Sequence, residues 1–368
     1  MDGIIDGVAK RVLMVLHDLR VGGAERVMLR LAGAFAERGA NVEVVTLGDG
    51  GPLERELAPG VRHVALGAWR VRAAVPRLAR HYRVSRPDAV VATLPHVNVV
   101  AAAAHRFAGS RARLLLREAN DPSFEHPRRE VGAWLARRAY ARADVVVALT
   151  QGNAEAIKRI LHVRPERVVV VPNPAPPAAG RLHGAGAAPP SAPAGSPRLL
   201  CVARLTAQKD HATLLDAFAR LKRTHAGAVL ALLGDGPERA VIERRVIALG
   251  LAEHVHLAGT VDDTGPWWAW ADVVLLTSRW EGFPNVLLEA LRYGVPMVAT
   301  DCPTGPREVL GEQRVGELVP VGDAVAIAAA VERLLADPPD AAALRRRADV
   351  FALAGIAERW WRLLEVPA

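Results

Sequence analysis

Two glutamates, Glu281 and Glu289, are separated by seven residues in the stretch RWEGFPNVLLEALRYG. We expect a helix to begin at Asn285, which places the first carboxylate just before the helix and the second about one turn inside it. Paired carboxylates can act as general acid and base, as metal ligands, or as acceptors for the hydroxyl groups of a polar ligand. They can also simply favour the start of a helix. The two residues by themselves leave all of these interpretations open.

The expected start of this helix also supplies backbone donors. They are the N–H groups of Gly282, Phe283, Asn285 and Val286. The helix provides no acceptors for these groups, and Pro284 makes the turn rigid, so the donors are available to ligand oxygens. A carboxylate suits the hydroxyl groups of a ribose or hexose better than it suits a phosphate. The stretch therefore favours the binding of a hydroxyl-bearing ligand.

Two cations, Arg204 and Lys209, stand five residues apart in the segment ARLTAQKD. The segment follows an expected strand and leads into an expected helix. Two cations beside a helix N-terminus suit a diphosphate, because both the side chains and the helix dipole attract negative charge. Two solvated surface cations are the alternative interpretation.

Two pairs of glycines also follow expected strands. Gly22 and Gly23, in GGAER, open the first expected helix, and Gly234 and Gly236 lie in LLGDGPER. Glycine lets the backbone approach a ligand closely, and a helix N-terminus favours anions. An ordinary tight turn explains each pair equally well. A further strand-to-helix segment, TDCPTGPREVL, begins at Thr300.

Short apolar runs alternate with helical patterns and would place all of these residues in loops after strands. In the first half the expected strands are RVLMVLH, NVEVVTLG, DAVVATLP, RARLLLRE and ADVVVALT. In the second half they are LLCVARL, AVLALLGDG, HVHLAGT, DVVLLTS and PMVATD. Short apolar strands flanked by helices predict parallel sheets covered on both faces. The fold class is therefore α/β, with two Rossmann-like doubly wound sheets that we expect to face a central cleft.

The chain is long enough for two domains, since it has 368 residues of which 51% are hydrophobic. The predicted N-terminal domain covers residues 1–171, and a linker rich in Pro, Ala and Gly covers 172–197. The second domain covers 198–350. A C-terminal helix in 351–368 is expected to pack back on the first domain.

The net charge of +8 suits a nucleic acid, an anionic membrane surface or a phosphorylated substrate. Arginines cluster with aromatic residues in HPRREVGAWLARRAYARAD and in WRVRAAVPRLARHYRVSRP. Such helices can lie on an anionic membrane, although solvated helix faces are the simpler interpretation. We expect no nucleic-acid partner, because no recognised binding module is present.

The location is predicted from cysteine use and from the N-terminus. The two cysteines, Cys201 and Cys302, are far apart and fit a reducing cytosol. Asp2, Asp6 and Lys10 interrupt the first apolar run, so we expect no signal peptide. The protein is therefore expected to be cytoplasmic, with peripheral binding to the inner face of the cell membrane as a further candidate.

Taken in order, GGAER, ARLTAQKD, LLGDGPER, EGFPNVLLEA and DCPTGPREVL resemble the retaining glycosyltransferases of family 4, which have the GT-B fold. The resemblance extends from Val12 to about Leu335. It implies that Arg204 and Lys209 hold the donor diphosphate and stabilise charge on the departing phosphate. It implies further that Glu281 accepts hydrogen bonds from the donor sugar and that Glu289 holds the ribose.

The resemblance also assigns roles in the first half. Gly22 and Gly23 would lie against the donor phosphates or the acceptor. His96, in ATLPHVN, falls where relatives carry a residue near the donor sugar, although a lone histidine is often structural. The loop LREANDP resembles the SERNDP loop of relatives, with Leu116 and Ala119 replacing serine and arginine. The role of this loop is therefore left open.

The activity implied is transfer of a hexosyl or N-acetylhexosaminyl group from a nucleotide diphosphate sugar to an acceptor hydroxyl, with retention at the anomeric carbon. A UDP-sugar donor is favoured, and the acceptor is expected to be a glycan or a lipid-linked sugar in polysaccharide or lipid-linked glycan synthesis. GDP-mannose as donor and a small natural product as acceptor are alternatives, and a two-lobed ligand-binding protein is the alternative that is not an enzyme. No cofactor and no essential metal is expected, since no zinc spacing or D-x-D motif ends a strand.

Overall fold

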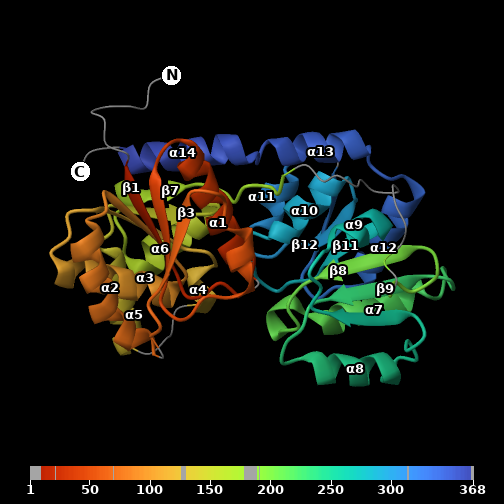
Figure 1. Ribbon diagram of the computed structural model, residues 1–368. Helices are drawn as coiled ribbons and strands as arrows, with labels where there is room; N and C mark the ends of the chain where they lie inside the picture. The colour runs from red at the N-terminus through yellow and green to blue at the C-terminus, as the bar shows by residue number, and fades with distance from the viewer. Residues whose placement is uncertain are drawn as a thin grey trace. The chain divides into compact units, whose positions relative to one another are not determined.

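The computed structural model describes residues 10–20, 22–68, 70–125, 130–177, 189, 191–312 and 315–365. The chain divides into two compact units, whose elements are labelled in Figure 1. Unit 1 consists of Met1–Pro174 and Leu353–Ala368, and unit 2 consists of Ala175–Ala352. Residues 178–188 and 190 of the expected linker lie outside the described residues.

Within the described residues, unit 1 contains a seven-stranded parallel sheet in the order β3-β2-β1-β4-β5-β6-β7. The strands are β1 (Arg11–Leu16), β2 (Asn41–Thr46), β3 (Val61–Ala65), β4 (Ala89–Thr93), β5 (Arg113–Arg117), β6 (Val145–Ala148) and β7 (Val168–Val170). The strand order reverses between β1 and β4, where loops at the carboxyl ends diverge and leave room for ligands. Strands β4 and β6 are buried along their whole length, so they contain apolar runs rather than an alternating pattern.

Helices cover both faces of this sheet. They are α1 (Gly23–Glu37), α2 (Val71–Ser85), α3 (Pro95–Ala108), α4 (Pro122–Glu125), α5 (Glu130–Tyr140), α6 (Gln151–Leu161) and α14 (Leu353–Glu365), with 3-10 turns η1 (Pro52–Glu56) and η2 (Pro165–Arg167). One core includes Tyr82 and Tyr140 from α2 and α5. The other includes Phe35 from α1 and Trp360 from α14, so the last helix of the chain belongs to the core of unit 1.

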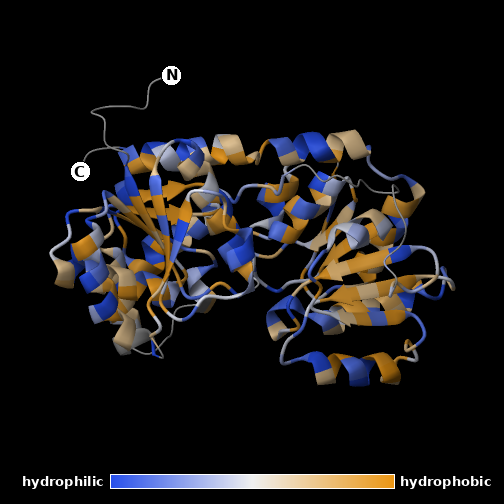
Figure 2. Ribbon diagram, in the orientation of Figure 1, coloured by the Kyte–Doolittle hydropathy of each residue, from blue (hydrophilic) through white to orange (hydrophobic). Residues whose placement is uncertain are grey.

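Unit 2 has the same architecture. Within the described residues it contains a six-stranded parallel sheet in the order β10-β9-β8-β11-β12-β13. The strands are β8 (Arg198–Val202), β9 (Val229–Leu233), β10 (Val255–Gly259), β11 (Val273–Leu276), β12 (Met297–Thr300) and β13 (Gly316–Val319). The helices are η3 (Ala207–Lys209), α7 (His211–Leu221), α8 (Arg239–Ala248), α9 (Gly265–Trp270), α10 (Asn285–Tyr293), α11 (Pro306–Leu310), α12 (Ala324–Ala336) and α13 (Ala341–Asp349). Figure 2 shows the strands of both sheets as the hydrophobic centres of their units.

The predicted fold class of two doubly wound parallel sheets is confirmed. The sequence patterns did not identify β3, β7 and β13. β3 is an edge strand without a single buried residue, β7 has three residues, and β13 has four residues and begins at a glycine. Among the described residues, no helix has the length and apolar character needed to cross a membrane.

Candidate active site

The candidate site of unit 2 lies where β8 and β11 pair side by side. The strand order of this sheet reverses between these two strands, so the loops at their carboxyl ends diverge there. Lys209 lies in the loop after β8, and Glu281 lies in the loop after β11. The fold thus brings together two charged residues that are 72 positions apart in the sequence.

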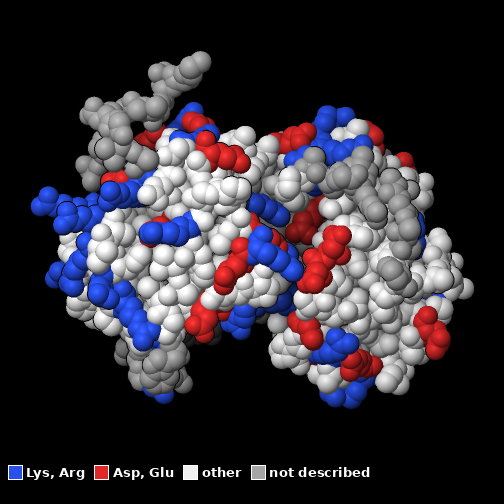
Figure 3. All heavy atoms as spheres, viewed as in Figure 1, with Lys and Arg blue, Asp and Glu red and all other residues white. Residues whose placement is uncertain are grey.

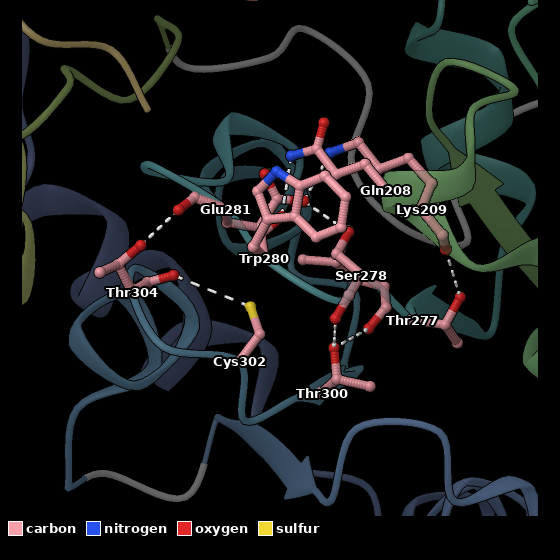
Figure 4. A network of polar contacts seen from close by, with 10 residues as sticks. Gln208, Lys209, Thr277, Ser278, Trp280, Glu281, Thr300, Cys302 and Thr304 are labelled. Carbon is pink, nitrogen blue, oxygen red and sulfur yellow. Dashed lines mark hydrogen bonds and ion pairs between the residues drawn. The ribbon is translucent and has the colours of Figure 1, made fainter. Parts of the chain in front are cut away.

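Lys209 and Glu281 form an ion pair. The Lys209 Nζ is 2.5 Å from Glu281 Oε1, and the Ser278 hydroxyl donates to the same oxygen at 2.5 Å (Figure 4). The two charged side chains are 16% and 6% exposed. A buried carboxylate is stable only when it is paired and hydrogen-bonded, and Glu281 meets both conditions.

Backbone contacts join the two loops around this pair. The Gln208 side-chain amide donates to the carbonyl of Trp280 at 2.8 Å, and the Arg279 N–H donates to the carbonyl of Gln208 at 2.8 Å. The Thr304 hydroxyl donates to the carbonyl of Glu281 (Figure 4). Gln208, Ser278 and Thr304 were not singled out from the sequence, because short polar side chains in loops carry no distinctive spacing.

Arg204 differs from Lys209. Its side chain is exposed, and no partner for it is found in the part of the chain that the structure describes. An unpaired guanidinium keeps all of its donors available to an anion.

The N-terminus of α10 begins beside Glu281. Pro284 is the N-cap, and its carbonyl accepts a hydrogen bond from Leu287 N–H at 3.0 Å. Among the described residues, the N–H groups of Gly282, Phe283 and Val286 have no acceptor. These donors lie next to the ion pair, so a negatively charged group could bind them.

Two further predicted residues lie on α10. Asn285 is its first residue, and Glu289 is half-buried on the next turn. Burial raises the pKa of Tyr293, and the negative charges of Asp263 and Glu289 raise it further, which places Glu289 near the phenol. Whether Glu289 contacts a ribose stays a prediction.

The segment DCPTGPREVL packs against the same helix start. Gly305 has a φ of +98°, and a Cβ there would lie 2.5 Å from the Pro284 ring. Glycine is therefore required both by conformation and by space. Burial raises the pKa of the neighbouring Cys302 thiol to about 12, so this cysteine stays protonated and is a poor nucleophile.

Gly234 and Gly236 allow two loops to pack closely. Gly234 has a φ of +126°, and a Cβ on it would lie 2.1 Å from the Ala203 carbonyl oxygen. A Cβ on Gly236 would lie 2.4 Å from the carbonyl oxygen of Leu205. Both glycines therefore support the loop that carries Arg204, and their contact with a nucleotide stays a prediction.

The predicted residues of unit 1 lie at the switch point between β1 and β4. Gly22 is the N-cap of α1 in an extended conformation and Gly23 is the first residue of the helix. His96 is the second residue of α3, and its ring lies 4.9 Å from the ring of His17 at an angle of 77°. His17 ends the run RVLMVLH, and its place after a strand was the signal that could have identified it.

The environment of His96 affects its charge. Partial burial lowers the pKa of His96, the neighbouring His17 lowers it further, and Asp18 opposes both effects. The imidazole is therefore biased towards its neutral form, which can both donate and accept a hydrogen bond.

The LREANDP loop of unit 1 holds the fold together. Arg117 is fully buried and donates to Thr93 Oγ1 at 2.7 Å and to Asn173 Oδ1 at 2.6 Å. The buried Glu118 accepts a hydrogen bond from Tyr140. Among the described residues, no group of three or more His, Cys, Asp or Glu side chains could hold a metal ion.

Comparison with known proteins identifies the family. Residues 196–337 match the model described as glycosyl transferases group 1, and residues 22–174 match the model described as glycosyl transferase 4-like domain. The chain is 30% identical over 327 residues to the lipopolysaccharide core biosynthesis glycosyltransferase LpsE of Rhizobium meliloti, covering 87% of this chain and 88% of that protein. The chain belongs to the group 1 glycosyltransferases. The predicted family and enzyme class are thereby confirmed.

Solved structures of glycosyltransferases share the fold. Anabaena HepE in complex with UDP and glucose matches with a TM-score of 0.79 and 22% identity, covering 97% of this chain and 99% of HepE. The apo lipopolysaccharide outer core galactosyltransferase WaaB matches with a TM-score of 0.71 and 20% identity, covering 96% and 99% of the two chains. This glycosyltransferase therefore has the GT-B fold that the sequence motifs predicted.

Proposed function

We propose that the protein transfers a hexosyl or N-acetylhexosaminyl group from a UDP-sugar to the hydroxyl of a growing glycan or lipid-linked sugar, with retention at the anomeric carbon. The observation that carries the proposal is the Lys209–Glu281 pair beside the open N–H groups at the start of α10. Polysaccharide or lipopolysaccharide synthesis is favoured because it is named for relatives such as LpsE and WaaB.

The residues proposed to bind the donor form two groups. One group binds the charged diphosphate, and the other binds hydroxyl groups of the two sugars. Arg204, Lys209 and the N-terminus of α10 bind the diphosphate, because cations and helix N–H groups complement negative charge. Glu281 and Glu289 accept hydrogen bonds from the hexose and the ribose respectively. Glu281 already accepts hydrogen bonds from Lys209 and Ser278, and its carboxylate can accept further ones from sugar hydroxyl groups.

The proposed reaction breaks the bond between the anomeric carbon and the diphosphate oxygen and forms a bond to the acceptor oxygen on the same face. The acceptor proton passes to the departing diphosphate, which leaves as the nucleoside diphosphate. No protein nucleophile is assigned. Arg204 and Lys209 stabilise the charge that develops on the leaving group, a form of electrostatic catalysis.

Unit 1 is proposed to bind the acceptor. Gly22, Gly23 and His96 lie at the switch point of its sheet, which is the usual ligand position in such folds. A neutral His96 would orient a sugar hydroxyl. The pairing of His96 with His17 supports this role because it fixes the ring direction.

A membrane surface and a cytoplasmic location are also part of the proposal. Lys and Arg side chains gather on the side of unit 1 that carries α2 and α5 (Figure 3). Phe107 and Trp134 are 66% and 53% exposed, and the Arg138 guanidinium lies 4.6 Å from the centre of the Trp134 ring. Basic and aromatic side chains together suit an anionic interface.

Co-sedimentation with lipid vesicles tests this point. The protein is expected to bind vesicles that contain anionic lipid and not to bind neutral vesicles. Binding to anionic vesicles that Trp134→Ser leaves unchanged would contradict the proposal.

The test of the proposed function has two stages. A thermal-shift screen with UDP-glucose, UDP-N-acetylglucosamine and GDP-mannose identifies the donor, because a bound ligand stabilises the folded state. Release of nucleoside diphosphate is then measured for the wild type, Lys209→Ala and Glu281→Ala. Turnover that both variants retain in full would contradict the site.

The screen also separates the donor alternatives. A relative from Mycolicibacterium smegmatis that is named as GDP-mannose-dependent is 34% identical over 176 residues, so stabilisation by GDP-mannose alone would favour that donor. A small natural product as acceptor would be supported if glycan acceptors fail to accelerate nucleotide release and hydroxylated small molecules succeed.

A further inference from the structure

We propose that Thr277 is a positioning residue for Lys209, an inference that rests on the proposed role of Lys209 in donor binding. Thr277 directly follows β11 and is buried. Its hydroxyl lies 2.9 Å from the carbonyl oxygen of Lys209 (Figure 4). The same hydroxyl lies 3.2 Å from the carbonyl oxygen of Asp210. One hydroxyl proton is thus shared between two neighbouring carbonyl groups of the loop after β8.

The backbone at this point needs such support. Asp210 joins η3 to α7 with a φ of 48° and a ψ of 53°, a left-handed conformation that is uncommon for residues other than glycine, although Asp adopts it more readily than most. Its carboxylate accepts hydrogen bonds from the hydroxyl of Thr213 at 2.9 Å and from Arg279 Nε at 3.1 Å. The side chain of Asp210 and the hydroxyl of Thr277 therefore hold the same strained turn from two sides.

The position of this turn determines where the Lys209 ammonium lies. Lys209 carries a long side chain, so the cation depends on its main chain and on Glu281 for its place. Substitution of the Thr277 hydroxyl by a methyl group would leave the part-buried carbonyl of Lys209 and the buried carbonyl of Asp210 without this donor and let the turn relax. A small displacement of a charged group from a developing charge reduces catalysis, because the benefit requires preorganised geometry.

The other hydroxyls drawn in Figure 4 act on different groups. Ser278 donates to the Glu281 carboxylate, and Thr300 donates to the carbonyl of Ser278 at 2.5 Å. Thr304 donates to the carbonyl of Glu281. These three hydroxyls support the Glu281 side of the ion pair, whereas Thr277 supports the Lys209 side.

The experiment is a double-mutant cycle on nucleoside diphosphate release with saturating UDP-sugar. Thr277→Val is expected to lower kcat about 3- to 10-fold, the range of one lost hydrogen bond, and Thr277→Ser to restore it to within about twofold because the hydroxyl returns. In the Lys209→Ala background, Thr277→Val is expected to change kcat by less than about twofold, since coupled residues are not additive.

A matched control comes from the other end of α7. The Thr224 hydroxyl lies 2.7 Å from Glu332 Oε1 and 3.1 Å from the carbonyl oxygen of Leu221, so it also has two acceptors, but it is far along the helix from Lys209. Thr224→Val is expected to leave kcat within about twofold of the wild type, as for a substitution remote from the site.

Three results would each overturn this inference and leave the proposed function intact. The first is a full effect of Thr277→Val in the Lys209→Ala background, and the second is an unchanged kcat in Thr277→Val. The third is failure of Thr277→Ser to restore the rate. An unchanged rate in Lys209→Ala would overturn this inference as well, and the proposed function would fail with it if Glu281→Ala also retained its full turnover. The cycle therefore distinguishes the two failures.

Discussion

Arg117 is the last residue of β5 in unit 1, and Arg204 lies two residues after β8 in unit 2. Both arginines are near the switch point of their sheet, yet their surroundings differ completely. Arg117 is 1% exposed and its guanidinium donates to Thr93 and Asn173. Arg204 is exposed and has no partner among the described residues. A fully satisfied cation inside a unit maintains the fold, whereas an unsatisfied cation at the surface of a loop is available to a ligand.

The Lys209–Glu281 pair is intermediate between these two extremes. Both of its side chains are largely buried, but the pair adjoins the open N–H groups at the start of α10. The comparison teaches that the position after a strand does not by itself distinguish a structural cation from a functional one. Burial and the presence of partners distinguish them.

The largest effect is expected from Arg117→Leu. Removal of the guanidinium takes away the donors to Thr93 and Asn173 and a positive charge that interacts with the buried Glu118. The free energy of unfolding is therefore expected to fall by about 3–5 kcal/mol. Urea unfolding measures this change. Arg111→Leu, which alters an exposed arginine two residues before β5, is the control and is expected to change stability by less than about 0.5 kcal/mol. Equal effects of the two substitutions would remove the distinction between buried and exposed cations.

Arg204→Ala is expected to show the opposite profile. Loss of one group that stabilises a developing charge lowers turnover about 100- to 1000-fold, while stability changes by less than about 0.5 kcal/mol because the side chain has no partner to lose. Nucleotide release and thermal unfolding measure the two quantities. Arg223→Ala, at an exposed position after α7, is the control. A variant that unfolds easily but retains turnover would reverse the assignment.

His211 is a third kind of titratable residue, because it is buried and has no ion pair among the described residues. Burial lowers the pKa of His211 to about 4, and its two ring nitrogens have no hydrogen-bond partner among the described residues. Between pH 4 and the ordinary value of 6.5, the unfolded chain binds a proton at His211 that the folded protein excludes. Stability is therefore expected to fall by about 3 kcal/mol as the pH decreases through this window, at about 1.4 kcal/mol per pH unit.

The measurement for His211 is urea unfolding at several pH values for the wild type and His211→Gln. The difference between the two curves isolates this residue from the other titrating groups. A pH dependence that the substitution leaves unchanged would contradict the prediction.

The smallest effect is expected from Tyr140→Phe. The phenol donates to Glu118 and accepts from Asn98 Nδ2 at 2.8 Å, so its removal weakens the network around Arg117 without creating a cavity. Stability is expected to fall by about 1–2 kcal/mol, with turnover unchanged. Tyr82→Phe is the control, because Tyr82 is similarly buried but its hydroxyl has no partner in the described part of the chain. A larger loss from Tyr82→Phe would contradict the importance of the network.

The sequence alone determined the alternation of strands and helices, because apolar periodicity is a local property of the chain. It also determined which residue types follow each strand, and these carried the family resemblance. The resemblance correctly gave the fold and the enzyme class, while the roles of the individual site residues stay predictions.

Only the tertiary structure decided which of these residues meet. Lys209 and Glu281 are 72 positions apart, and they pair because β8 and β11 are neighbours in the sheet. Gly234 and Gly236 proved to be required by the packing of two loops, and Thr277 and His17 acquired partners that no spacing in the sequence indicates. Local patterns specify elements, but contacts between distant loops depend on the strand order, which the sequence pattern does not contain.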